Sequence, residues 1–494
     1  MRVLFVTSEV ATIIKTGGLA DVSAALPAAL HELGVDIRIL MPGYSPVLKA
    51  LTKLEVVADF SVHPPNDWGN FPPSRLLRGA MKNGIPLWVF DCPALFQRTG
   101  GIYQDKHGKD WADNAQRFGL FSKVAALMGS ADSPLPWKPD VVHCNDWQSG
   151  LAPAFLHYAK NPAPCVMTVH NLAFQGTFPS SVIPELGLPW DCYKPDGVEF
   201  YGNLSFLKAG LFYARHITTV SPSYAKEIQT EALGFGMQGL LAHRSKDLTG
   251  IINGIDINEW NPAADSYLVH TYDADDLSGK AANKKELQKR LGLDEDDDIP
   301  LFGLVSRFAY QKGLDVVLEV AERLIAMPAQ LVLLGSGDIP IQRNVRKLSH
   351  QHPGKIAAHV GFDERLSHLI EAGADLFLMP SRFEPCGLNQ MYSQRYGTPP
   401  IVHATGGLID TVVDCSAKSL KDGTASGFNF NKMDADSLLR AAKHAVKVYH
   451  DKKSWRVLQQ NCMSKDLSWE PSAQAYQQIY SNLVKGSPKS RKKR

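Results

Sequence analysis

Residues 300–307 have the sequence PLFGLVSR, and four similar apolar runs follow: AQLVLLGSG (329–337), KIAAHVGF (355–362), ADLFLMPS (374–381) and PPIVHA (399–404). Each run is short, continuous and rich in apolar residues, which is typical of parallel strands that are covered on both faces. Helical patterns, such as residues 313–325 and 365–372, separate the runs. The alternation predicts an α/β lobe built on a doubly wound parallel sheet.

The same alternation occupies the first half of the chain. Apolar runs occur there at residues 2–7 (RVLFVT), 35–40, 86–90, 139–143 and 165–169. We expect each run to be a buried parallel strand, with the helical segments between the runs covering the sheet. Two successive arrays predict two Rossmann-like, doubly wound lobes that face each other across a deep cleft.

A polar stretch at residues 245–300 marks the seam between the arrays, and its acidic run DEDDD is most simply a solvated loop. We therefore place the first lobe at residues 1–250 and the second at 251–465, joined by a linker within the seam. A last helical pattern, residues 466–484, is expected to cross back to the first lobe. The basic tail, residues 485–494, offers no apolar side chains for docking and is predicted to be disordered.

Composition excludes two classes of partner. The 494 residues include 52 Lys and Arg against 50 Asp and Glu, and six of the basic residues lie in the last ten positions. This balance argues against a protein that coats nucleic acid, because phosphate binding needs a strong basic excess. No apolar stretch approaches the ~18 residues of a membrane span. We expect neither a nucleic-acid nor a membrane partner, and the sequence leaves the oligomeric state open.

The cysteines indicate the compartment. Seven of them are scattered along the chain and no C-x-x-C motif occurs, a pattern that favours neither a disulfide framework nor a zinc ribbon. The chain opens with RVLFVTSE, which is typical of a core strand and not of a signal peptide. We therefore expect a reducing, cytoplasmic location.

Unusual residues follow the predicted strands, where ligands bind in open α/β sheets. In the first array, Lys15-Thr16-Gly17-Gly18-Leu19 follows the first strand and opens a helical pattern with Asp21 in its first turn. The paired glycines allow backbone N–H groups to approach an anion at the helix N-terminus. A plain tight turn also fits this segment.

The second array supplies matching groups. Arg307 and Lys312 follow its first strand, and two fixed cations five residues apart suit a diphosphate. Glu384 lies in the turn Arg382-Phe383-Glu384-Pro385-Cys386-Gly387-Leu388, where a carboxylate beside backbone N–H groups suits sugar hydroxyls. Thr405-Gly406-Gly407-Leu408 is a second glycine-pair turn before a helix. Taken singly, each pattern also fits an exposed side chain or an ordinary loop.

Three further polar clusters lie at strand or lobe ends: His170-Asn171, Asn145-Asp146-Trp147 and Asn253-Gly254-Ile255-Asp256. The loop at residues 15–19 lacks the G-x-G-x-x-G fingerprint, and the turn Leu334-Gly335-Ser336-Gly337-Asp338 lacks its third glycine. No Walker A motif occurs in the sequence, so NAD and P-loop chemistry have no positive support. No metal-ligand motif accompanies the polar residues. Together the motifs predict a site for a sugar with a diphosphate leaving group, in which Arg, Lys and helix N-termini offset the phosphate charge without a metal ion or other cofactor.

These motifs resemble those of bacterial glycogen synthases and the related starch synthases. The segments that carry the resemblance are KTGGLADV (15–22), HCNDWQSGL (143–151), TVHNLAFQG (168–176), NLSFLKAG (203–210), IINGIDINEWNP (251–262), SRFAYQKGLD (306–315), PSRFEPCGLNQMY (380–392) and ATGGLIDTV (404–412). The resemblance extends from about residue 1 to residue 484. It implies a GT-B fold and metal-independent transfer of glucose, with retention of configuration, from ADP-glucose to the non-reducing end of an α-1,4-glucan such as glycogen.

The resemblance also implies roles for individual residues. Those implied in catalysis are Glu384, Arg307, Lys312, His170 and Asp21. Those implied in substrate binding are Lys15, Gly18, Asn171, Asn253, Phe362, Cys386, Gly387, Leu388, Tyr392, Thr405, Gly406 and Gly407. Phe362 takes the place of the aromatic residue, often Tyr, that stacks on adenine in the family. Tyr392 stands where related retaining families have a second Glu, which matches glycogen synthases and leaves ribose recognition unassigned.

Several alternatives remain open at this level. A retaining enzyme can use a carboxylate nucleophile, as retaining glycosidases do, but no carboxylate is obviously placed for that role, so we favour departure and attack on the same face of the sugar. The donor can be UDP-glucose, and the product another glucoside such as sucrose phosphate. Beyond this class, the alternatives are a nucleotide-linked oxidoreductase and a non-catalytic glucan-binding protein.

Overall fold

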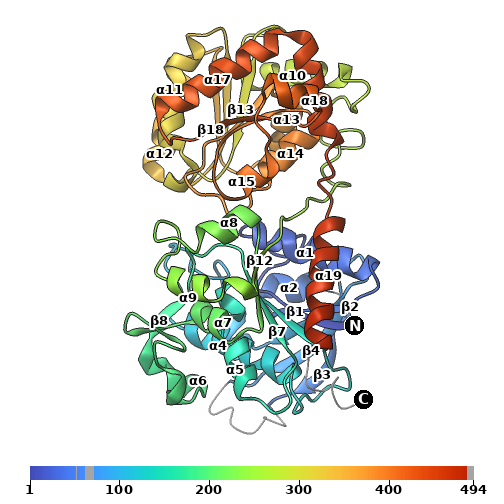
Figure 1. The fold of residues 1–494 in the computed structure, drawn as a ribbon, viewed down its shortest axis with the longest axis vertical. Coiled ribbons are helices and arrows are strands. Elements are labelled where there is room, and N and C mark those ends of the chain that lie inside the picture. The colour runs from blue at the N-terminus through green and yellow to red at the C-terminus, as the bar shows by residue number, and fades with distance from the viewer. Residues whose placement is uncertain (52, 62–71, 487–494) are drawn as a thin grey trace. The chain divides into compact units, whose positions relative to one another are not determined.

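The computed structural model describes residues 1–51, 53–61 and 72–486, so most of the basic tail lies outside the described residues. The chain divides into two compact units. One comprises Met1–Ile251 with the segment that begins at Trp469, and the other comprises Ile252–Ser468. Each unit is an α/β layer structure built on its own sheet (Figure 1).

The first unit contains a nine-stranded sheet in the order β12-β11-β7-β6-β1-β2-β5-β4-β3. The strands from β12 to β5 are parallel, whereas β4 and β3 are antiparallel additions at one edge. In chain order the strands are β1 (Arg2–Val6), β2 (Asp36–Pro42), β3 (Glu55–Asp59), β4 (Arg75–Ala80), β5 (Pro86–Asp91), β6 (Val141–Asn145), β7 (Cys165–Val169), β11 (His216–Thr219) and β12 (Leu248–Gly250). The five strands predicted in this half of the chain are therefore confirmed, with shifts of up to two residues at their ends.

The core of the first unit explains why these runs form strands. Val3 to Val6 are fully buried in β1, as expected for a central parallel strand. Helix α1 (Gly18–Glu32) packs beside α19 (Glu470–Lys485), and α19 also contacts β6 (Figure 1). The Tyr480 hydroxyl meets Nδ1 of the buried His143 on β6 at 2.6 Å. The last helix is thus an integral part of the first unit.

The second unit contains a six-stranded, fully parallel sheet in the order β15-β14-β13-β16-β17-β18. Its strands are β13 (Leu301–Val305), β14 (Gln330–Gly335), β15 (Ile356–Val360), β16 (Leu376–Met379), β17 (Pro400–His403) and β18 (Phe428–Phe430). Counted from β13, this is the strand order 3-2-1-4-5-6 of dinucleotide-binding folds. The order reverses between β13 and β16, so the fold itself predicts a ligand site at their carboxyl ends.

Helix α10 (Ser278–Leu291) was not expected within the polar seam. It is stable there because its buried polar side chains find partners. The Lys280 ammonium donates to the carbonyl of Ala372 at 2.9 Å and to Oγ1 of Thr398 at 2.5 Å, and buried polar groups with partners carry little penalty. The short sheet of β8 (Thr177–Pro179), β9 (Glu199–Phe200) and β10 (Asn203–Ser205) was also not predicted.

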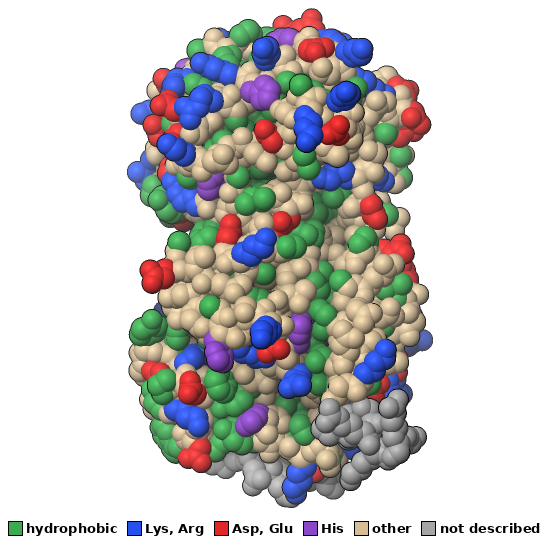
Figure 2. Space-filling model, viewed as in Figure 1, with side chains coloured by type: hydrophobic (Ala, Val, Ile, Leu, Met, Phe, Trp, Pro, Cys, Tyr) green, Lys and Arg blue, Asp and Glu red, His purple; other side chains and the backbone are tan. Residues whose placement is uncertain are grey.

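The surface agrees with the balanced charge of the sequence. On the face shown in Figure 2, the described Lys and Arg side chains alternate with Asp and Glu and do not gather into one basic patch. None of the described helices combines the length and the hydropathy that a membrane-spanning segment requires.

Candidate active site

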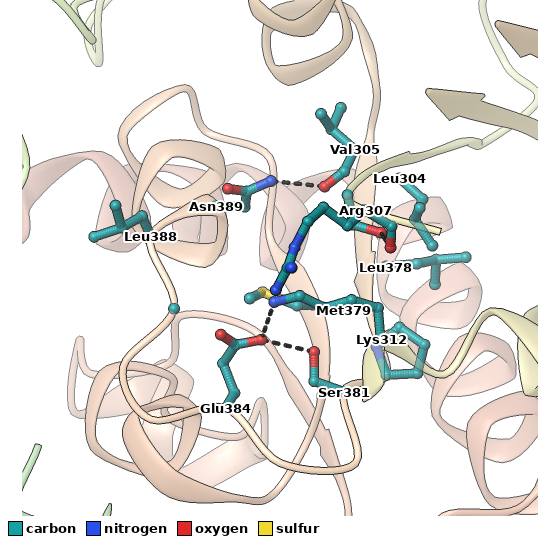
Figure 3. A pocket seen from close by; sticks show the side chains of 13 residues that line it. Leu304, Val305, Arg307, Lys312, Leu378, Met379, Ser381, Glu384, Leu388 and Asn389 are labelled. Carbon is teal, nitrogen blue, oxygen red and sulfur yellow. Dashed lines mark hydrogen bonds and ion pairs between the residues drawn. The ribbon is translucent and has the colours of Figure 1, made fainter. Parts of the chain in front are cut away.

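A pocket lies in the second unit at the carboxyl ends of β13 and β16, where the strand order reverses. Its volume is about 180 Å³. The lining residues come from the two strands and from the segments that follow them (Figure 3): Leu304, Val305, Ser306, Arg307, Lys312, Leu378, Met379, Pro380, Ser381, Glu384, Gly387, Leu388 and Asn389. The structure thus brings Arg307, Lys312, Glu384, Gly387 and Leu388 together, although they are up to 81 residues apart in sequence.

Two of the residues that line this pocket, Lys312 and Glu384, form an ion pair. The Lys312 ammonium lies 2.5 Å from Oε2 of Glu384, and the Ser381 hydroxyl donates to the same oxygen at 2.8 Å. Glu384 is only 7% exposed, so the lysine and the hydroxyl stabilise a carboxylate that burial would otherwise penalise. Oε1 of Glu384 has no hydrogen-bond partner among the described residues. It is therefore able to accept a hydrogen bond from a hydroxyl of a ligand.

Arg307 gives the pocket a second cation. It lies two residues beyond the end of β13, its side chain is exposed, and it extends into the pocket beside Lys312 in Figure 3. Across the pocket, Asn389 opens helix α14 (Asn389–Arg395) and donates from Nδ2 to the carbonyl of Val305 at 2.7 Å. Two cations and one carboxylate leave a net positive charge, which suits a ligand with an anionic part and a hydroxyl-bearing part.

The turn that carries Glu384 is backed by the second glycine-pair turn. The backbone N–H of Gly407 donates to the Glu384 carbonyl at 3.0 Å. A Cβ atom on Gly407 would lie 2.4 Å from the carbonyl oxygen of Cys386, so only glycine allows this approach. Thr405, Gly406 and Gly407 are buried and are not among the residues that line the pocket. In this structure they support the pocket wall.

Four other predicted residues, Asn253, Phe362, Cys386 and Tyr392, lie in the second unit but outside the lining. Asn253 is buried, and its backbone donates a hydrogen bond to the thiol of the buried Cys386. Tyr392 is 8% exposed and its ring stacks on Trp260, with centroids 3.7 Å apart. Phe362 follows β15 at the far side of the sheet and is 85% exposed. An aromatic ring left this open to water is unusual, and it is available for stacking.

In the first unit, Glu9 holds the predicted loop before α1 through hydrogen bonds to Thr16. Both carboxylate oxygens of the buried Glu9 accept from Thr16, at 2.5 Å from the backbone N–H and at 2.7 Å from the hydroxyl. The Tyr103 hydroxyl also donates to Glu9, at 2.5 Å. On the loop itself, the Lys15 ammonium pairs with Asp21 at 2.7 Å. Gly18 is the first residue of α1, so these predicted residues lie together at the N-terminus of that helix.

A second polar cluster of the first unit forms beyond β6 and β7. His170 directly follows β7, and its Nε2 meets Oδ1 of Asn145 at 3.0 Å. Burial lowers the pKa of His170 to about 3, so the imidazole is neutral at physiological pH. Oδ1 of Asp146 accepts from the backbone N–H of His170 at 2.7 Å, and the Asn171 backbone also donates to this carboxyl group.

Asp146 has an unusual backbone conformation and an unusual carboxyl pKa. Its φ angle of 52° lies in the left-handed region, which few residues with a Cβ atom adopt and which is found more often at functional sites. Burial raises the pKa of its carboxyl group to about 7, against the lowering effect of the two backbone hydrogen bonds. The carboxyl group therefore titrates near neutral pH.

This titration predicts a pH-dependent effect of Asp146→Asn on stability. Because the folded state holds the proton more tightly than the unfolded state, the contribution of Asp146 to stability falls as pH rises from about 4 to about 7, and is constant above that. Asparagine does not titrate, so the melting temperature of the variant should rise relative to the wild type across this window. Thermal unfolding at pH 5, 6, 7 and 8 measures the difference. A difference that stays constant over this range contradicts the assigned pKa.

Three residues of these clusters, Glu9, Asp146 and Ser381, have roles that their sequence motifs do not reveal. Glu9 and Ser381 lie within three residues of the ends of β1 and β16. Their position just after a strand is the one feature of the sequence that indicates a functional role for them. Asp146 belongs to one of the predicted polar clusters, but the sequence does not show that its carboxyl group accepts hydrogen bonds from the backbone of His170 and Asn171. Their partners are distant in sequence or are backbone groups, which a motif does not reveal.

Comparisons with known proteins agree with this arrangement. Residues 2–243 match the starch synthase catalytic domain, and residues 283–456 match the glycosyl transferases of group 1. The glycogen synthase of Nitrosomonas eutropha is 58% identical over 489 residues, which cover 98% of this chain and 96% of that protein. The glycogen synthase of Nitrosospira multiformis is 55% identical over 489 residues, with 98% and 97% coverage.

Solved structures of glycosyltransferases also resemble this chain. The catalytic domain of starch synthase IV from Arabidopsis thaliana, bound to ADP and acarbose, superposes with a TM-score of 0.86 at 33% identity and covers 98% of this chain and 99% of that one. Sucrose-phosphate synthase from Thermosynechococcus elongatus, with a TM-score of 0.60 at 17% identity and coverage of 98% and 100%, shares the fold. The chain therefore belongs to the starch and glycogen synthase family of glycosyltransferases and has their GT-B fold.

Proposed function

We propose that this enzyme is a glycogen synthase that transfers glucose from ADP-glucose to the non-reducing end of an α-1,4-glucan, with retention of configuration and release of ADP. The observation that carries the proposal is the pocket at the β13–β16 reversal, where two cations lie beside a buried carboxylate. This combination suits a sugar diphosphate, because the cations attract the phosphates and the carboxylate accepts from hydroxyl groups. A related starch synthase has been solved with ADP and acarbose, which supports a nucleotide donor.

Each charged residue of the pocket has a proposed task. Arg307 and Lys312 bind the diphosphate and stabilise the negative charge that grows on the departing ADP. Glu384 accepts from hydroxyl groups of the donor glucose through Oε1, next to the backbone of Cys386, Gly387 and Leu388. Lys15, Gly18, Asp21, His170, Asn171 and Asn253 are proposed to complete the sugar and acceptor side. Thr405–Gly407 are proposed to act on donor binding through the Glu384 turn that Gly407 supports, and Tyr392 to contribute to donor binding through its packing in the same unit.

We propose that the reaction proceeds on one face of the sugar. The bond between the anomeric carbon and the ADP oxygen breaks first, which leaves an oxocarbenium-like glucosyl group and a diphosphate held by the two cations. The 4-hydroxyl of the acceptor then bonds to the anomeric carbon from the same face and gives its proton to a phosphate oxygen. Glu384 is already paired with Lys312 and Ser381, so it is better suited to holding hydroxyl groups than to acting as a nucleophile.

Donor competition tests this function. The protein is incubated with glycogen and with ADP-glucose, UDP-glucose or both, with and without EDTA, and nucleotide release is measured. We expect ADP-glucose to be the preferred donor and EDTA to have no effect, because Arg307 and Lys312 take the role that a metal ion has in other transferases. Preference for UDP-glucose corrects the donor, whereas loss of activity on chelation with rescue by Mg²⁺ or Mn²⁺ contradicts the metal-independent mechanism.

Phe362 provides a prediction for the nucleotide. We propose that adenine stacks on its exposed ring, since aromatic stacking on a base contributes about 1–3 kcal/mol. Phe362→Ala should therefore weaken ADP binding about 5- to 150-fold, whereas Phe362→Tyr, which keeps the ring, should bind ADP like the wild type. Calorimetric titration with ADP measures both variants. Equal affinity of the alanine and tyrosine variants rules out stacking at this residue.

We also propose a cytoplasmic location. All seven cysteines lie among the described residues, and each is unpaired and buried. Free thiols in this number are typical of a reducing compartment.

A further inference from the structure

Two loops carry the charged groups of the pocket, and they leave different strands. The lysine loop, residues 306–313, follows β13 and carries Arg307 and Lys312. The glutamate loop, residues 380–388, follows β16 and carries Glu384. The distance between the Lys312 ammonium and the Glu384 carboxylate therefore depends on how firmly one loop is held against the other.

Arg382 of the glutamate loop holds the lysine loop through residues that do not line the pocket. Its guanidinium makes two hydrogen bonds to the carboxylate of Asp315, at 2.7 and 2.6 Å, and a third to the carbonyl of Tyr310 at 2.7 Å. It also stacks over the Tyr310 ring, with the central carbon 3.6 Å from the ring centroid. Asp315 lies in the first turn of α11 (Leu314–Ile325), immediately after the lysine loop.

The backbones of the two loops are joined as well. The N–H of Arg382 donates to the carbonyl of Gln311 at 2.8 Å, and the Gln311 side chain donates to the carbonyl of Phe383 at 3.1 Å. Gly313 adopts a φ angle of 69°, and a Cβ atom there would lie 2.0 Å from the carbonyl oxygen of Pro380. The loops thus touch at their backbones, and the neighbours of Lys312 and of Glu384 are fixed to each other.

We propose that Arg382 and Asp315 form a positioning clamp that sets the geometry of Lys312 and Glu384 for glucosyl transfer. A guanidinium suits this task because its planar fork fixes direction as well as distance, which a lysine ammonium does not do. Arg382 is 20% exposed and Asp315 is about half exposed, so this bidentate pair contributes more to stability than an ordinary surface ion pair does. A displacement of about 1 Å at a reacting centre can cost about 10²-fold in rate. The inference rests on the roles proposed above for Lys312 and Glu384.

The test compares the clamp with a matched ion pair on the same helix. Arg323 of α11 pairs with Asp436 at 2.8 Å, and both side chains are at least half exposed. We expect Arg382→Ala and Asp315→Asn each to lower kcat for glucosyl transfer at least tenfold, and Arg382→Lys to fall between Arg382→Ala and the wild type. Arg323→Ala should leave kcat unchanged. Because Arg382 is more buried and makes more contacts than Arg323, the melting temperature of Arg382→Ala should fall further than that of Arg323→Ala, and kcat is therefore compared at a temperature at which every variant is folded.

Chemical rescue separates positioning from a purely structural role. Millimolar guanidinium should restore part of the kcat of Arg382→Ala but not that of Asp315→Asn, and NaCl at the same concentration should restore neither. If kcat of Asp315→Asn and Arg382→Ala stays within twofold of that of Arg323→Ala, the inference is wrong while the proposed function stands. If Arg382→Ala does not fold, Asp315→Asn and Arg382→Lys decide the matter. If the wild type releases no ADP from ADP-glucose in the presence of glycogen, the proposed function is wrong, and the proposed clamp has no glucosyl transfer to support.

Discussion

Replacing Lys312 with alanine is expected to lower kcat for glucosyl transfer by about 10²–10³-fold, with a smaller rise in the donor KM. The ammonium lies in the pocket beside Arg307, where negative charge grows on the leaving diphosphate. A preorganised group that stabilises such charge contributes about 2.7–4 kcal/mol to the transition state. Because this stabilisation is strongest in the transition state, its loss affects kcat more than ground-state binding.

The variant also leaves Glu384 without its cationic partner. Breaking a buried ion pair by removing one partner can cost about 3–5 kcal/mol of stability, so steady-state kinetics must be accompanied by thermal unfolding. Lys285→Ala is a suitable control, since Lys285 forms an exposed ion pair with Asp297. A large rise in donor KM with kcat unchanged would show that Lys312 binds ground state and transition state equally well, which contradicts the assigned role.

Glu384→Gln is expected to lower kcat about 10²-fold while ADP binds almost as well as to the wild type. The amide keeps most hydrogen-bonding capacity toward sugar hydroxyls but loses the negative charge that favours an oxocarbenium-like centre. ADP carries no glucose, so its affinity reports on the phosphate and base contacts alone. Calorimetric ADP affinity and steady-state kinetics, measured side by side for Glu384→Gln and Lys312→Ala, distinguish the two roles.

Two outcomes would overturn this view of Glu384. If Glu384→Gln weakens ADP binding as much as Lys312→Ala does, Glu384 supports the nucleotide site and not the sugar. If azide restores a glucosyl product of inverted configuration to a shortened Glu384 variant, Glu384 is a covalent nucleophile, as in retaining glycosidases, and the same-face mechanism is wrong.

The sheets were predictable because buried parallel strands leave a strong local signal. The run LFGLV in β13 contains only buried or half-buried residues, and continuous apolar runs of this length have few alternatives. The polar helix α10 was not predictable in the same way. Its Lys280 is buried against Ala372 and Thr398, and those partners lie about a hundred residues away in sequence.

The site was predictable as a set of strand-end positions, but its contacts were not. The motifs correctly indicated that Arg307, Lys312 and Glu384 would share one pocket, since the carboxyl ends of neighbouring parallel strands meet. They did not show that Gly407 supports the Glu384 turn instead of lining the pocket, nor that Tyr392 stacks on Trp260. A turn motif fixes the local backbone, whereas the direction in which it donates depends on the packing of the whole unit.

The proposed activity, transfer of glucose from ADP-glucose to a glucan with retention of configuration, can be measured in a single reaction. The most direct test incubates the wild type with ADP-glucose and maltoheptaose, quantifies ADP, and identifies the anomer of each new linkage by proton NMR. We expect one new α-1,4 linkage for each ADP released. Free glucose in place of a longer glucan, or new β-linkages, would contradict it.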